Sequence, residues 1–68
     1  MLETVAIVGV GLIGGSFALA LRQAGFRGTI LGVSSTRTLA RALDLQVISE
    51  GVTLDEACAR ADLLYLAG

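Results

Sequence analysis

A length of 68 residues allows one small domain, and a net charge of −1 excludes a surface for nucleic acids or anionic membranes. The single cysteine excludes an intrachain disulfide and a cysteine zinc site, so no metal site is expected. No apolar run has the roughly 18 residues of a membrane span, and Met1 leads into a strand without the basic segment of a signal peptide, so we expect a soluble cytoplasmic protein.

The first two predicted elements are a strand over Thr4–Gly9 and a helix over Leu12–Ala24. The strand is apolar throughout, which is typical of a strand buried on both faces of a parallel sheet. Helical spacing predicts an inward face on the helix, made of Ile13, Phe17, Ala20, Leu21 and Ala24. Gly25 suits the left-handed position after the helix, where Phe26 can fold back on Leu21 in a Schellman cap.

Five further elements follow in chain order: strand Thr29–Val33, helix Thr36–Leu43, short strand Val47–Ile48, helix Leu54–Arg60 and strand Leu63–Ala67. Ser34, Ser35 and Thr36 are candidate N-caps of the second helix, whose inward residues are Leu39, Ala42 and Leu43. In the third helix, Thr53 and Glu56 match a capping box, and Glu56 and Arg60 form an i,i+4 pair. We expect Leu54, Ala57 and Cys58 to share its inner face, with the cysteine buried as a small hydrophobic residue.

The junction between the first strand and the first helix carries the most specific motif, Gly9-x-Gly11-x-x-Gly14. In a dinucleotide-binding loop, the first glycine makes the tight turn, the second lets the backbone approach a pyrophosphate, and the third lets the helix pack on the strand. Free N–H groups and the helix dipole favour an anion at the same point. The strand before and the helix after the motif favour cofactor binding over an unliganded glycine turn.

The alternation of strands and helices predicts an α/β fold, a partial Rossmann-type doubly wound parallel sheet with strand order 3-2-1-4. Residues 1–68 then form a dinucleotide-binding half-domain, with the cofactor crevice at the carboxyl ends of strands one and four. Its mean hydropathy of +0.80 is high for a domain of this size. We therefore expect further polypeptide or a second copy to cover apolar surface, and a homodimer or larger assembly through the strand-four edge at Leu63–Ala67.

Residues after the second strand bear on the choice of cofactor. Ser34 stands where an acidic residue would favour NAD, and Arg37 follows it three positions later. Ser34, Ser35 and Arg37 could all donate hydrogen bonds to a 2′-phosphate, so NADP is favoured, with NAD as the alternative. A second interpretation is that the serines only cap the helix and that Arg37 is solvated. Ser16, on the first helical turn, could likewise contact a cofactor phosphate or solvent.

The segment VAIVGVGLIGGSFALAL, residues 5–21, resembles the prephenate/arogenate dehydrogenase family of tyrosine biosynthesis. The run from Gly11 to Ser16 is more specific than the glycine pattern alone. The likeness continues through residues 25–28, 30–33, 42–51 and 61–67, and it covers the N-terminal part of such an enzyme. This N-terminal part does not include the substrate and dimerisation domain of the family.

Membership would imply an NAD(P)-dependent oxidative decarboxylation of prephenate to 4-hydroxyphenylpyruvate, or of arogenate to tyrosine. The resemblance implies that the pyrophosphate side of the cofactor is lined by Gly9, Gly11, Leu12, Ile13, Gly14, Gly15 and Ser16, and that Ser34, Ser35 and Arg37 face the adenosine ribose. The catalytic histidine of the family lies beyond these residues and the chain contains no histidine, so no catalytic residue is assigned and no turnover by this chain alone is expected.

Three alternatives stay open. The chain could be a stand-alone module that binds NADP without catalysis, or a Rossmann fragment that self-associates. It could also belong to a related dehydrogenase that acts on another small acid.

Overall fold

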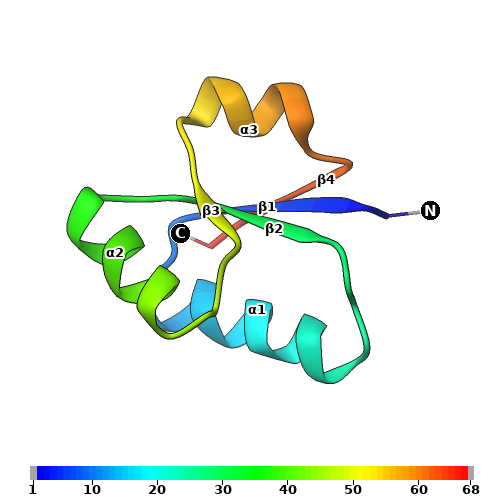
Figure 1. The fold of residues 1–68 in the computed structure, drawn as a ribbon. Helices are drawn as coiled ribbons and strands as arrows, with labels where there is room; N and C mark the ends of the chain where they lie inside the picture. The colour runs from blue at the N-terminus through cyan, green and yellow to red at the C-terminus, as the bar shows by residue number, and fades with distance from the viewer. Residues whose placement is uncertain (1, 68) are drawn as a thin grey trace.

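Four parallel strands form one sheet in the order β3-β2-β1-β4, as predicted (Figure 1). The computed structural model describes residues 2–67 without the side chain of Leu12, so predictions on that side chain and on the two terminal residues lie outside the described residues. The elements are β1 (Thr4–Val8), α1 (Leu12–Gln23), β2 (Thr29–Val33), α2 (Thr36–Asp44), β3 (Glu50–Gly51), α3 (Leu54–Arg60) and β4 (Leu63–Leu66).

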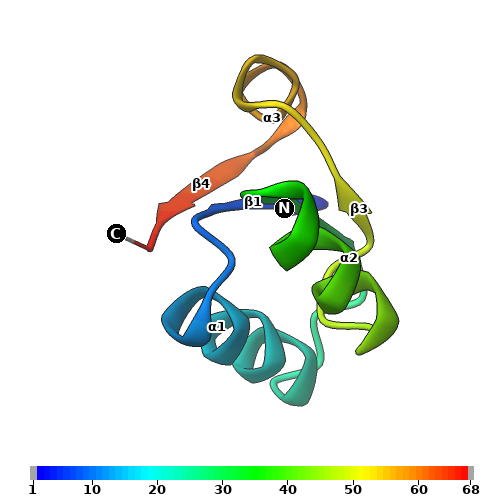
Figure 2. The same ribbon diagram turned by 90° about the vertical axis from the view of Figure 1, so that its left-hand side faces the viewer.

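The helices cover the sheet from both sides, with α1 and α2 on one face and α3 on the other (Figures 1 and 2). Successive residues of β1 point to opposite faces, so this central strand supplies both halves of the core. Val5 and Ile7 pack with Ile30 on the face that α1 and α2 cover. Ala6 packs with Leu31 and Ala57 beneath α3. The alternating helices and apolar strands of the sequence thus give the predicted α/β layers.

The cap at the end of α1 is confirmed as a Schellman motif. Phe26 N donates to the Leu21 carbonyl at 2.9 Å, and Gly25 N donates to the Arg22 carbonyl at 3.0 Å. Gly25 has a φ of +98°, which is the left-handed conformation that this motif needs.

The predicted strand Val47–Ile48 is wrong, because β3 forms at Glu50–Gly51, where it pairs with Leu31 and Gly32 of β2. A second Schellman motif ends α2: Val47 N donates to the Ala42 carbonyl at 2.9 Å, and Gln46 takes a φ of 57°. This turn carries Val47 and Ile48 into the core as loop residues rather than strand residues.

The predicted inward face of α1 is only partly right. Phe17 and Leu21 pack on the core, but Ile13 is 65% exposed, and Ala20 and Ala24 are exposed as well. Gly14 and Ala18 are buried instead, because small residues at the contact line let the helix lie close to the sheet.

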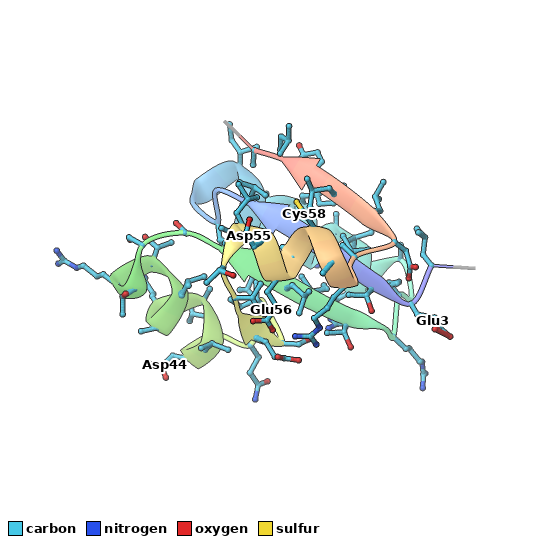
Figure 3. The ribbon with its side chains drawn as sticks, turned by 90° about the horizontal axis from the view of Figure 1, so that it is seen from above. Glu3, Asp44, Asp55, Glu56 and Cys58 are labelled. Atoms are coloured by element: carbon cyan, nitrogen blue, oxygen red, sulfur yellow. The ribbon has the colours of Figure 1, made fainter. Side chains whose placement is uncertain are left out.

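The predictions for α2 and α3 also need correction. Leu43, Leu54 and Cys58 are exposed, whereas Ala42 and Ala57 are buried. A two-turn helix such as α3 meets the sheet along one narrow line, and Ala57 occupies it, so the flanking Cys58 lies on the exposed surface of the helix (Figure 3). Half of the capping box is confirmed: Thr53 Oγ1 accepts from Glu56 N at 3.1 Å. The Glu56 carboxylate binds Arg60 at 2.7 Å and so completes the predicted i,i+4 pair instead of reaching back.

Candidate functional site

The loop between β1 and α1 turns sharply at Gly9. This glycine has a φ of +90°, and a Cβ there would collide with the carbonyl oxygen of Ala67, which follows β4. Its N–H donates to the Val33 carbonyl at 2.8 Å. The loop is therefore held at the carboxyl ends of β1, β2 and β4, the edge where doubly wound sheets bind their ligands.

Gly14 lets α1 approach β1 closely. A Cβ at this position would lie 2.5 Å from the carbonyl oxygen of Gly9 and 3.0 Å from Cγ2 of Ile7. Any larger residue would push the helix away from the strand and from the loop. The turning role predicted for Gly9 and the packing role predicted for Gly14 are thus confirmed as geometry, while their contact with a cofactor stays a prediction.

The amino end of α1 is open. Its N-cap is Gly11, which has no side chain to bond the free N–H groups, and the first turn carries no acidic residue. By contrast, α2 is capped by Ser35 and α3 by Thr53. A Cβ built on Gly11 meets nothing within 4 Å, so space for a ligand lies directly against this backbone. Unpaired N–H groups, a positive dipole end and open space together fit a pyrophosphate.

The three residues predicted to choose the cofactor lie at the start of α2. Ser34 is half-buried just after β2, and Arg37 is exposed in the first helical turn. The Ser35 hydroxyl caps the helix: it accepts from Thr38 N at 3.3 Å and donates to Thr38 Oγ1 at 3.0 Å. Because Gly9 bonds Val33, the chain brings Ser34 next to the glycine loop. The capping role is confirmed for Ser35, and binding by all three residues stays a prediction.

A cavity of about 420 Å³ opens between α1 and α2. On the α1 side it is lined by Gly11, Gly15, Ser16 and Leu19, and on the α2 side by Thr38, Arg41, Ala42 and Leu45. Three of the predicted site residues, Gly11, Gly15 and Ser16, therefore meet in one cavity. Ser34, Ser35 and Arg37 lie outside its lining.

Sequence reasoning missed the contribution of Thr38 and Arg41 to this cavity. The signal that could have found them is helical spacing, because positions 38, 41, 42 and 45 fall on one face of a helix. The apolar pattern of α2 predicts Ala42 on this face, and it gives no signal for the polar residues Thr38 and Arg41.

Outside this cavity, Arg60 forms ion pairs with Glu50 and Glu56 on the protein surface. Hydrogen bonds from Arg60 hold the pKa of Glu50 below its usual value. The acidic residues labelled in Figure 3 do not gather at one point. Within residues 2–67, no group of three or more His, Cys, Asp or Glu side chains could hold a metal ion. No helix in this part of the chain is both long and apolar enough to cross a membrane.

Comparison with solved structures finds close likeness. Prephenate dehydrogenase from A. aeolicus, solved in complex with hydroxyphenyl propionate and NAD+, is 39% identical over 97% of this chain with a TM-score of 0.88. A second structure of prephenate dehydrogenase from Aquifex aeolicus is 46% identical over 78% of the chain with a TM-score of 0.71. Over nearly its whole length the chain is similar to part of a prephenate dehydrogenase.

This likeness confirms the resemblance expected from residues 5–21. The chain spans 24% and 19% of the lengths of the two solved prephenate dehydrogenases. No protein-family model matches the chain, and a search of curated proteins also finds no match. The likeness to this family is therefore shown by the solved structures alone.

Proposed function

We propose that the chain binds the nicotinamide dinucleotide of a prephenate dehydrogenase, which oxidatively decarboxylates prephenate to 4-hydroxyphenylpyruvate in tyrosine biosynthesis. The observation that carries this proposal is the open, uncapped amino end of α1 beside Gly11. It is supported by the NAD+ complex of the A. aeolicus prephenate dehydrogenase, a similar structure. When bound, the nicotinamide supplies the hydride acceptor. A related dehydrogenase that acts on another small acid is the alternative enzyme.

In this proposal, residues of the glycine loop bind and orient the dinucleotide. Backbone N–H groups from the first turn of α1 donate to the pyrophosphate, because they have no acceptors within the helix. The residues assigned to this side are Gly9, Gly11, Leu12, Ile13, Gly14, Gly15 and Ser16. None of them removes a proton or receives the hydride, so catalytic residues are expected in another part of the enzyme.

The proposed cofactor is NADP, with NAD as the alternative. NADP is supported by Ser34, which places no carboxylate at the end of β2, and by the cation of Arg37 in the first turn of α2. NAD is supported by the A. aeolicus prephenate dehydrogenase, which was solved with NAD+.

Calorimetric titration of the protein with NADP+ and NAD+ tests the proposal. Gly11→Val fills the open space at the N-cap and should weaken both dinucleotides by about tenfold or more, since lost charge-assisted hydrogen bonds are worth that much. Ala20→Val is the control, because it places the same residue, valine, at an exposed position farther along α1. A folded protein that binds neither dinucleotide would overturn the proposal.

We further propose that residues 1–68 do not turn over prephenate by themselves. In this proposal they bind the cofactor, and the catalytic residues lie in another part of the enzyme. An assay of the chain with prephenate and either dinucleotide should give no reduced nicotinamide, and measurable turnover would contradict this. The cytoplasmic location expected from the sequence also stays a prediction, which cell fractionation would test.

The second candidate function is a self-associating module, which could still bind NADP without catalysis. It is favoured by the β4 edge, where Leu63, Leu64 and Leu66 are exposed. A homodimer or larger assembly through this edge is compatible with dinucleotide binding at the amino end of α1.

A further inference from the structure

Val10 is the one residue with a side chain in the loop between β1 and α1, where it stands between Gly9 and Gly11. It is 3% exposed and packs in the core on the face of the sheet that α1 and α2 cover. A Cβ on the next residue, Gly11, would meet nothing within 4 Å. The loop thus turns bare backbone toward open space and is held to the core by one buried valine.

The place on the sheet that receives Val10 is Gly32 of β2. A Cβ built on Gly32 would lie 3.0 Å from Cγ2 of Val10. The same Cβ would lie 2.7 Å from Cδ1 of Ile48 and 3.2 Å from Cδ2 of Leu39. These three side chains fill the volume that a side chain at position 32 would occupy, as close packing of the core requires. Any residue larger than glycine there would compete with the valine of the loop for this space.

Two adjacent residues of β2 fix the loop. The Gly9 N–H donates to the Val33 carbonyl at 2.8 Å, and the neighbouring Gly32 receives Val10 by packing. Val10 also borders the cavity between α1 and α2, so a displaced side chain has space into which it can move. Because the χ1 angle of a β-branched residue is restricted, such a displacement carries the backbone of the loop with it.

We infer that Gly32 and Val10 are positioning residues for the dinucleotide, because their contact sets where the glycine loop lies relative to β2. This inference rests on the proposed dinucleotide site. Neither residue is among those proposed to bind the cofactor, and both act through Gly11 and the first turn of α1. Hydrogen bonds from backbone N–H groups weaken steeply when their distance and angle change. A methyl group at position 32 therefore weakens pyrophosphate binding by moving the loop.

Calorimetric titration with NAD+ and NADP+ tests this on wild type, Gly32→Ala, Val10→Ala and the double variant. Gly32→Ala should weaken both dinucleotides equally, by about tenfold, because both carry the same pyrophosphate. Val10→Ala removes the contact from the other side and should weaken both by about threefold or more. The double variant should bind more tightly than Gly32→Ala, because the methyl group added at position 32 fills space that the lost Cγ atoms leave.

Gly51→Ala is the matched control. Gly51 pairs with Gly32 in the sheet, and a Cβ on it would lie 2.9 Å from Cδ1 of Leu39. All three of the nearest atoms belong to Leu39, so this substitution crowds α2 without meeting the loop. We expect Gly51→Ala to change affinity by less than about twofold. Circular dichroism gives conditions in which each variant is folded, so that the titrations report the affinity of the folded state.

The outcomes separate this inference from the function on which it rests. If wild type binds and Gly32→Ala keeps its affinity, or if Gly51→Ala weakens binding as much, the inference fails and the proposed function stands. The same holds if the double variant binds no better than Gly32→Ala. If Gly32→Ala does not fold, Val10→Ala decides, and unchanged affinity in that folded variant overturns the inference. If folded wild type binds neither dinucleotide, the proposed function and the inference both fail.

Discussion

At the scale of single residues, two adjacent glycines of α1 have opposite surroundings. A Cβ on Gly14 would lie 2.5 Å from a backbone oxygen, whereas a Cβ on Gly15 would meet nothing within 4 Å. In the sequence they differ only in position: Gly14 is the third glycine of the Gly9-x-Gly11-x-x-Gly14 motif, and Gly15 follows it. The structure shows that the first is required for packing and that the second leaves open space toward the cavity.

This difference predicts opposite effects of the same substitution. Gly14→Ala should lower the free energy of unfolding by about 1–3 kcal/mol, because the added methyl group overpacks the contact between helix and strand. Gly15→Ala should raise it by about 0.5–1 kcal/mol, because alanine favours a helix interior over glycine. Urea unfolding of both variants measures the effects, and equal changes in the two would contradict the packing argument.

Asp62 predicts a dependence of stability on pH. Its carboxylate accepts from the N–H groups of Glu3 and Thr4, each at 3.0 Å, and these bonds hold its pKa below the usual value. A carboxyl group with a lowered folded-state pKa stabilises the fold above its unfolded pKa, near 3.9, and loses this contribution as the pH falls through the folded value. Asp62→Ala should therefore destabilise the protein at neutral pH.

Thermal unfolding at several pH values measures this effect. The gap between wild type and Asp62→Ala should narrow as the pH falls below about 4. Asp44→Ala is the control, because Asp44 is an exposed carboxylate on α2 (Figure 3). A gap that stays constant with pH would show that the carboxylate charge does not hold the start of β1.

At the scale of elements, α1 and α2 end in the same motif built from different residues. The left-handed position holds Gly25 after α1 and Gln46 after α2, where φ is 57°. A side chain in this conformation costs about 1–2 kcal/mol, and glycine avoids that cost. Gln46→Gly should therefore raise the free energy of unfolding by roughly 1 kcal/mol. Thermal denaturation tests this, with Gln23→Gly in α1 as a control that should destabilise.

The same contrast explains which elements could be predicted. The cap after α1 contains a glycine, so its position follows from the sequence. The cap after α2 has none, so the β-branched pair Val47–Ile48 predicts a strand at a position where the chain forms a turn, and the strand itself forms three residues later. The strand order followed from the alternation of elements, because that pattern needs no knowledge of side-chain packing.

The sequence likewise predicts one part of the candidate site and not the other. The glycine loop followed from its motif, because each glycine answers a local requirement of the backbone. The cavity wall at Thr38 and Arg41 did not, because it depends on how α2 is rotated against α1. The exposure of Cys58 was missed for a similar reason: α3 is short and meets the sheet through Ala57.

At the scale of the whole molecule, part of the exposed apolar surface lies on β4, where Leu63, Leu64 and Leu66 are exposed. The short helix α3 lies mainly against β1 and β2, and it leaves leucines of the neighbouring strand β4 exposed. Leu64 and Leu66 pair in register with Ala6 and Val8 on this side of the sheet and remain exposed. An open strand edge next to exposed leucines favours association with another chain.

Leu66→Lys tests whether this edge joins two copies of the chain. Leu66 is 69% exposed, so a lysine there should disturb the fold little while placing a charge on the proposed contact. We expect the variant to shift assemblies toward monomer in analytical ultracentrifugation. Leu45→Lys is the matched control, because Leu45 is 63% exposed but lies after α2 on the other face of the sheet. A wild type that stays monomeric at high concentration, or equal masses for both variants, would exclude the β4 edge as the contact. A shift confined to Leu66→Lys would instead mean that β4 supplies the cover that the apolar composition requires.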